Sequence, residues 1–184
     1  MLLSLIHIFP FAEYAGRLGT KTAGGAAGLS EAGAPDRAEV KAVLDRMAEE
    51  GVLLKEFREA VNPAKIAQFL ESPLAARMAQ AAAGGKLYKE QPFVLGLPAR
   101  TLDDSFPEEE TVLIQGIIDV YLEEEDGLVV ADYKTDSVTQ PQELINRYQV
   151  QLDYYARALE QLTGKRVKEK IIYSFALAAE VPLA

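Results

Sequence analysis

The sequence predicts an α/β domain in which a mixed sheet is flanked by helices. Helical hydrophobic periodicity runs over the segment that follows Asp36, and strand-like apolar runs replace it from residue 86 onward. One long amphipathic helix then separates three of these strands from a last one. The expected order is therefore helices, three strands, a long helix and a strand, which is an arrangement typical of this fold class.

The expected helices have clear start and stop signals. The first begins after Asp36, which can form a capping box with Glu39, and it ends at Gly51. Two short helices follow, and each has a capping side chain directly before a proline at its first position. These pairs are Asn62-Pro63 and Ser72-Pro73.

Three strands are expected at residues 86–95, 111–123 and 128–134. Glu-Glu-Asp-Gly at 124–127 separates the last two, and Asp-Gly between apolar runs is a strong hairpin signal. The long helix is expected from about Pro141 to Leu162, closed by Gly164, and the final strand at about 168–177.

Length and composition limit the chemistry. The 184 residues, 49% of them hydrophobic, indicate one globular domain, which we expect at residues 36–184. Residues 1–35 are expected to be an apolar leader and a Gly/Ala-rich linker. The chain has no cysteine and one histidine, which excludes a disulfide scaffold, a thiolate zinc site and an iron–sulfur cluster. The leader is too short for a membrane helix and lacks the basic region of a signal peptide, so no membrane partner is expected.

The net charge of −9 comes from one local block. Residues 103–126 contain ten acidic residues and no basic one. Acidity spread over the chain would disfavour a nucleic-acid partner, whereas a local block is compatible with a solvated loop or a cation site. Within the block we assign Asp119 to a site and expect the other nine acids to lie in surface loops and at a hairpin tip.

Hairpin geometry brings three charged residues together. A two-residue turn at Asp126-Gly127 sets Asp119 opposite Lys134, and a four-residue loop sets Asp119 opposite Asp132. Both registers place the three on one face of the sheet, because side chains alternate with period 2. Two buried carboxylates require compensation, and oxygen ligands favour Mg²⁺ or Mn²⁺ over zinc. The alternative is a plain cross-strand ion pair between Asp119 and Lys134 at a sheet edge.

Three further residues are candidates for this site. Glu90, in the first strand, is by itself a solvated residue, and it becomes relevant only if that strand neighbours the hairpin on the same face. Gln151 and Tyr155 are an i, i+4 pair on the apolar stripe of the long helix. A tyrosine there is usually core, but a buried glutamine amide needs hydrogen-bond partners.

Three motifs occur in a fixed order: Gly116-Ile-Ile-Asp119, Asp132-Tyr-Lys-Thr-Asp136 and Gln151-Leu-Asp-Tyr-Tyr155. The ordered set resembles the RecB-like branch of the PD-(D/E)xK nuclease superfamily. Over about residues 37–184 the sequence is similar to the C-terminal nuclease domains of the AddA type of bacterial ATP-dependent helicase/nuclease. This resemblance implies a restriction-endonuclease-like core and makes residues 36–184 a nuclease domain.

The resemblance also implies roles for the site residues. Asp119 and Asp132 would bind Mg²⁺, for which Mn²⁺ is a possible substitute, and the backbone carbonyl of Tyr133 would be a further ligand. Lys134 would position or activate the attacking water and stabilise the pentavalent phosphate. The remaining three would support the site: Glu90 by organising the metal site, and Gln151 and Tyr155 by contacting the DNA backbone.

The implied activity is metal-dependent exonuclease cleavage of single-stranded DNA in double-strand break repair and recombination. The implied partners in the cytoplasm are single-stranded DNA, the helicase motor of the same full-length polypeptide, and an AddB-like partner protein. The alternatives are a weakened or inactive DNA-guiding module and a standalone Cas4-like nuclease, although Cas4-like proteins generally carry cluster-binding cysteines.

Two features depart from the family pattern. The family's upstream metal-binding histidine is absent near Gly19-Thr20, and His7 stands in a leader unlike the family. We therefore expect residues 1–9 to be foreign and the first helix to be truncated. The phosphate-binding loop of an ATPase motor is also absent from the sequence.

Overall fold

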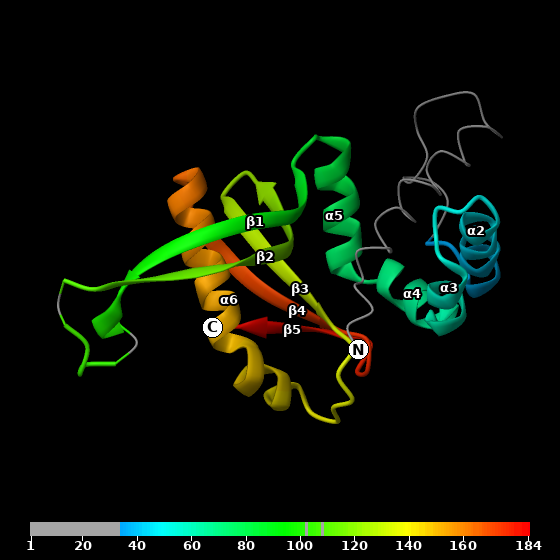
Figure 1. The fold of residues 1–184 in the computed structure, drawn as a ribbon. Helices are drawn as coiled ribbons and strands as arrows, with labels where there is room; N and C mark the ends of the chain where they lie inside the picture. Colours follow the sequence, from blue (N-terminus) through cyan, green and yellow to red (C-terminus); the bar gives the residue numbers. More distant parts are fainter. Residues whose placement is uncertain (1–33, 102, 108) are drawn as a thin grey trace.

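The computed structural model describes residues 34–101, 103–107 and 109–184. It shows a five-stranded mixed sheet with helices packed on both faces (Figure 1), which confirms the predicted α/β class. The predicted leader, His7 and nearly all of the predicted linker lie outside the described residues. No helix within the described ranges is both long and apolar enough to cross a bilayer.

In the described chain, four helices precede the sheet: α2 (Arg37–Glu49), α3 (Lys55–Ala60), α4 (Pro63–Leu70) and α5 (Pro73–Ala83). The expected capping box between Asp36 and Glu39 is present at the start of α2. Asn62 and Ser72 cap α4 and α5 ahead of their prolines. Helix α3 is not predicted from the sequence, because its six residues contain no buried side chain and so carry no helical hydrophobic pattern.

The strands occur in sheet order β1-β2-β3-β4-β5. Their bounds are β1 (Leu87–Pro98), β2 (Thr111–Glu124), β3 (Gly127–Lys134), β4 (Val167–Ser174) and β5 (Ala179–Leu183), with a 3-10 turn η2 (Ala99–Thr101) after β1. Neighbouring strands are antiparallel except β3 and β4, which are parallel. The crossover between those two is α6 (Pro141–Thr163), which ends at Gly164 in the left-handed conformation.

The prediction of a single last strand over 168–177 is wrong. β4 ends at Ser174, and the chain turns through residues 175–178 and returns as β5. The turn consists of Phe-Ala-Leu-Ala and contains none of the Gly, Pro, Asn or Asp residues that signal a turn in sequence. Ala178 instead takes the left-handed backbone conformation, with φ of 50°.

The sheet separates two apolar layers. One layer joins α2, α4 and α5 to one face, with Tyr133 among its buried side chains. The other joins α6 to the opposite face through Leu152, Tyr155 and Leu159. Because neighbouring residues of a strand point to opposite faces, Asp132 lies on the α6 face, next to Tyr133 on the α5 face.

Candidate functional site

The β2–β3 hairpin adopts the register that brings the two candidate aspartates together. Val120 pairs with Ala131, so the next position along the ladder sets Asp119 opposite Asp132. The two turn residues are Glu125 and Asp126, so the expectation of a turn at Asp126-Gly127 is wrong. The register is the one expected from the longer loop, and it places both carboxylates on one face.

Asp132 is a buried carboxylate that is incompletely paired. Its residue is 1% exposed, and its Oδ2 atom accepts no hydrogen bond from the part of the chain that the structure describes. Lys134 Nζ lies 2.6 Å from that oxygen as an ion pair. Burial raises the pKa of Asp132 to about 6, against the opposing charge of Lys134 and with a smaller contribution from the charge of Asp119.

Asp119 is more accessible and holds one backbone hydrogen bond. Its Oδ2 accepts from the Tyr133 backbone N–H at 3.3 Å. Burial again raises the pKa, which Glu90 also raises and Lys134 lowers. The alternative of an edge pair between Asp119 and Lys134 is wrong, because β2 lies inside the sheet and Lys134 pairs with Asp132.

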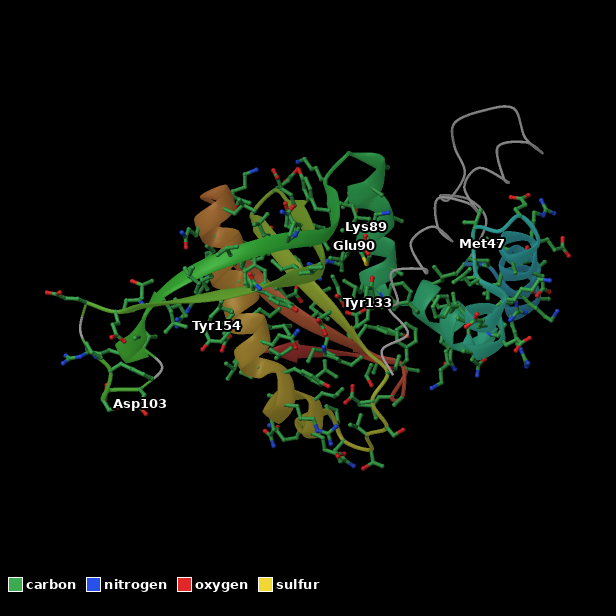
Figure 2. All side chains as sticks on the ribbon, viewed as in Figure 1. Met47, Lys89, Glu90, Asp103, Tyr133 and Tyr154 are labelled. Atoms are coloured by element: carbon green, nitrogen blue, oxygen red, sulfur yellow. The ribbon has the colours of Figure 1, made fainter. Side chains whose placement is uncertain are left out.

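Glu90 lies across from Asp119 on the neighbouring strand. Lys89 pairs with Val120 and Gln91 with Ile118, so the register sets Glu90 opposite Asp119. Figure 2 labels this residue on β1. Its φ of 51° is a left-handed conformation that is rare for a residue with a side chain.

The alternation of side chains between the two faces of the sheet is broken in β2 beside Asp119. Val120 belongs to the apolar layer of α5, whereas Ile118, two positions earlier, belongs to the layer of α6. A regular strand would place both side chains on the same face. The candidate site therefore lies where the β1–β2 hairpin departs from a regular ladder.

The glutamine and tyrosine of α6 contact the lysine of β3. Lys134 Nζ donates to Gln151 Oε1 at 3.4 Å, and Gln151 Nε2 donates to the Tyr155 hydroxyl at 2.5 Å. The Tyr155 ring meets the Phe93 ring edge-on, with centroids 5.5 Å apart. The predicted amide thus finds partners on both sides, and the structure brings Gln151 and Tyr155 to the site.

Packing explains why glycine stands at position 116 of the first motif. A Cβ added there would lie 2.9 Å from an atom of the Phe93 ring. The two residues are direct cross-strand partners, so the ring lies over the glycine. The absence of a side chain at Gly116 lets Phe93 reach Tyr155.

Two residues at the site, Tyr148 and Asp136, are missing from the sequence-based set of candidates. The Tyr148 ring centroid lies 4.1 Å from Lys134 Nζ, and the Tyr148 hydroxyl donates to Asp136 Oδ1 at 2.9 Å. Tyr148 looks like part of an apolar stripe in sequence. The sequence could have indicated Tyr148 through its position three residues before Gln151, since residues at i and i+3 are neighbours on a helix.

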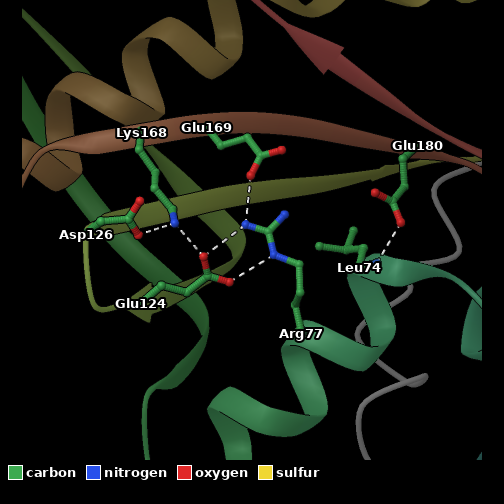
Figure 3. Close-up of polar contacts among 7 residues, drawn as sticks. All are labelled: Leu74, Arg77, Glu124, Asp126, Lys168, Glu169 and Glu180. Carbon is green, nitrogen blue, oxygen red and sulfur yellow. Dashed lines mark hydrogen bonds and ion pairs between the residues drawn. The ribbon is translucent and has the colours of Figure 1, made fainter.

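The acids at the end of the hairpin are ion-paired as well as solvated. Glu124 accepts from Arg77 of α5 and also contacts Lys168, as Figure 3 shows. Glu123 pairs with Lys165. These side chains lie at the hairpin tip, as expected, and each is also fixed by a cation from another element.

The site has a donor set that suits one hard divalent cation. Two carboxylates converge, and a buried oxygen of Asp132 lacks the hydrogen bonds that would satisfy it. Carboxylate oxygens are the ligands that Mg²⁺ prefers. Within the described ranges no group of three or more His, Cys, Asp or Glu side chains is arranged to hold a metal. The two aspartates would thus need backbone oxygen or water to complete such a site.

Comparison with known proteins finds one family and a consistent set of relatives. The family model of the PD-(D/E)XK nuclease superfamily matches residues 14–181. Three relatives are each named as the A subunit of an ATP-dependent helicase/nuclease. The protein of Lachnoclostridium phytofermentans is 40% identical over 75% of this chain and 13% of its own length. The proteins of Clostridium botulinum strain 657 and Acetivibrio thermocellus are 40% and 42% identical over 78% and 76% of this chain.

The chain spans 11% of the length of the latter two relatives. Among solved structures, the crystal structure of SSO0001 gives a TM-score of 0.38 at 13% identity, covering 94% of this chain and 77% of that chain. That likeness is too low to support an argument.

Proposed function

The chain belongs to the PD-(D/E)XK nuclease superfamily, and from that membership we propose that it cleaves single-stranded DNA with Mg²⁺ as the exonuclease domain of a bacterial helicase/nuclease complex. The observation that carries this proposal is the buried Asp132, which lies across from Asp119 and whose Oδ2 atom accepts no hydrogen bond among the described residues and is balanced only by the Lys134 ammonium. A carboxylate in this state is costly for folding, and a bound cation removes the cost.

The residues of the site divide the work of phosphodiester hydrolysis. Asp119, Asp132 and the backbone carbonyl of Tyr133 would hold Mg²⁺, and Mn²⁺ could replace it. When bound, the cation would withdraw charge from the phosphate in the transition state. Lys134 would orient the attacking water and donate to the phosphate oxygens.

Three residues would support this arrangement. Gln151 holds Lys134 from α6 and is itself held by Tyr155. Glu90, opposite Asp119 on β1, adds negative charge beside the two aspartates. We assign Glu90 the organisation of the metal site, and Gln151 and Tyr155 the contact with the DNA backbone.

We propose the wider biological role from the resemblance to helicase/nuclease proteins, which the relatives' names support only as far as a helicase/nuclease subunit. In this proposal the domain acts in double-strand break repair and recombination in the cytoplasm. It receives single-stranded DNA from the helicase motor of a full-length polypeptide and works beside an AddB-like partner protein. The proposal for these partners depends on the similarity to the helicase/nuclease relatives, of which the chain spans a small part.

The proposal is tested with a 5′-labelled single-stranded oligonucleotide, with and without Mg²⁺. We expect metal-dependent cleavage, lost by about a thousandfold or more in Asp132→Asn and Lys134→Ala. Asp126→Asn, an exposed aspartate in the turn of the same hairpin, is the matched control and should cleave normally. Equal cleavage by wild type and Asp132→Asn would refute the assignment.

The DNA-guiding module is the second candidate, and one observation favours it. The described residues supply two converging aspartates but no group of three metal-ligating side chains. Calorimetric titration with Mg²⁺ separates the two functions. Binding at millimolar metal supports the nuclease, whereas no binding and no cleavage, with DNA still retained on the protein, supports the guiding module. A Cas4-like nuclease is disfavoured because the sequence has no cysteine.

A further inference from the structure

We infer that Tyr148 is a positioning residue that holds the Lys134 ammonium in place at the proposed nuclease site. This inference rests on the proposed function for its kinetic consequence, although its structural part stands without it. Tyr148 lies on α6 and Lys134 at the end of β3, so the contact joins the helix to the strand that carries the site.

The contacts of Lys134 come from three directions. Its Nζ atom lies 2.6 Å from Asp132 Oδ2, 3.4 Å from Gln151 Oε1 and 4.1 Å from the centroid of the Tyr148 ring. The last distance is well inside the range at which an aromatic face attracts an ammonium. The lysine side chain is 14% exposed, so water screens this attraction only in part.

The tyrosine is itself fixed at its far end. Its hydroxyl donates to Asp136 Oδ1 at 2.9 Å, and the same oxygen accepts from Arg147 at 3.3 Å. Asp136 follows Lys134 by two residues, so strand and helix are tied on both sides of the ring. The hydrogen bond fixes the far end of the Tyr148 side chain and so limits the positions that its ring can take over Lys134.

The ring supplies a contact that a metal ion would not disturb. Asp132 cannot give its full charge both to Lys134 and to a cation at the same oxygen. If the carboxylate held a cation, the lysine would lose part of its attraction to Asp132. The neutral face of Tyr148 still attracts the ammonium, and Gln151 still accepts its hydrogen bond. A lysine stem is otherwise flexible, so the ring limits where the ammonium can go.

The first test is spectroscopic and requires neither metal nor DNA. In protein labelled with ¹³C at the lysine ε position, the ε protons of Lys134 should be shifted upfield by the ring current of Tyr148. Tyr148→Phe keeps the ring and should keep the shift, whereas Tyr148→Leu should lose it. Lys134→Ala assigns the signal by its absence. A Lys134 signal at the ordinary lysine position in the wild type would overturn the inference.

The second test is kinetic, on single-stranded DNA with saturating Mg²⁺. Tyr148→Leu should lower kcat about tenfold and change KM less than about twofold, because the lysine acts on the reacting phosphate. Tyr148→Phe should keep kcat within about threefold of the wild type. Tyr154→Leu changes another tyrosine of α6, labelled in Figure 2, and serves as the matched control with unchanged kcat.

The outcomes separate this inference from the proposed function. If neither the wild type nor any variant cleaves DNA, the proposed function fails, and the ring-current shift alone decides the position of Lys134. If Lys134→Ala is inactive but Tyr148→Leu cleaves like the wild type, the inference about Tyr148 is wrong. A rise in KM with unchanged kcat in Tyr148→Leu would also overturn it, since that result indicates a contact with DNA.

Discussion

Two charged clusters that share strand β2 shift the pKa of their carboxylates in opposite directions. The hairpin-tip cluster joins β2, the turn, β4 and α5, and consists of Glu124, Asp126, Lys168, Glu169 and Arg77. The site cluster lies five residues away along β2 and consists of Asp119, Asp132 and Lys134. Each cluster brings carboxylates of the β2–β3 hairpin next to a cation, and Figure 3 shows the tip cluster.

The difference lies in burial and in how the carboxylate oxygens are used. Both Glu124 oxygens are engaged by the Arg77 guanidinium, which holds the pKa of that carboxyl down at about 2. Asp132 has an oxygen that accepts no hydrogen bond among the described residues, and burial raises its pKa to about 6. The tip cluster therefore stabilises the fold, whereas the buried carboxylate of the site cluster lowers stability, as is typical of functional sites.

Neutralising one acid in each cluster should give the largest difference between the two clusters in cleavage and in stability. Asp132→Asn should abolish cleavage and raise the free energy of unfolding at pH 8 by roughly 1–3 kcal/mol, because the burial that raises the pKa of Asp132 disfavours its ionised form in the folded state. Glu124→Gln should cleave normally and unfold more easily, because the guanidinium loses its ionised partner. Urea unfolding measures both stabilities. A less stable Asp132→Asn protein would mean that its ion pair with Lys134 outweighs the cost of burial.

The stability contributions of Asp132 and Glu124 should depend on pH in opposite directions. The pKa of Asp132 is raised in the folded state, so ionisation is easier in the unfolded chain, and the stability cost develops as pH rises from about 4 to about 6. The advantage of Asp132→Asn should therefore be full at pH 8 and vanish near pH 4. Glu124 has a lowered pKa, so its contribution is present above about pH 4.5 and lost toward pH 2. Paired urea titrations at pH 4, 6 and 8 check the first limb, and an advantage that persists at pH 4 would contradict it.

Removing the shared cation of the tip should have an intermediate effect. Arg77→Met leaves Glu124 and Glu169 without their guanidinium, and it should lower the free energy of unfolding by roughly 1–2 kcal/mol. The aliphatic part of methionine keeps much of the packing of the arginine stem. Cleavage below the melting transition should be unchanged, since Arg77 lies away from the site cluster. A selective loss of kcat would show that the two clusters are coupled.

The sequence predicts the fold better where local chemistry decides the structure. Asp36, Asn62, Ser72 and Gly164 act through neighbours within one helical turn, so their predicted helix ends are correct. The turn at 175–178 is not predicted, because Ala178 adopts a left-handed backbone conformation that is typical of glycine and that an alanine does not indicate in sequence.

The candidate site shows the same limit. The shared face of Asp119, Asp132 and Lys134 follows from alternation, but their register depends on which residues form the turn. The break in alternation beside Glu90 depends on long-range packing and cannot be read from a period of two. The contact of Tyr148 with Lys134 likewise needs the placement of α6 against β3, which local sequence does not encode.

The smallest expected effect belongs to Lys168 of the hairpin-tip cluster. Lys168 contacts Glu124 and Asp126, but Glu124 keeps both hydrogen bonds from Arg77 without it. Lys168→Met should therefore lower the free energy of unfolding by less than about 1 kcal/mol, and 0.5 M NaCl should remove most of that difference because its partner Asp126 is exposed and salt screens such a pair. Arg77→Met should keep most of its deficit at the same salt concentration, since the guanidinium binds both oxygens of Glu124 through directional hydrogen bonds. If salt abolished both deficits equally, the tip cluster would act through long-range charge alone, and the contrast with the site cluster would reduce to burial.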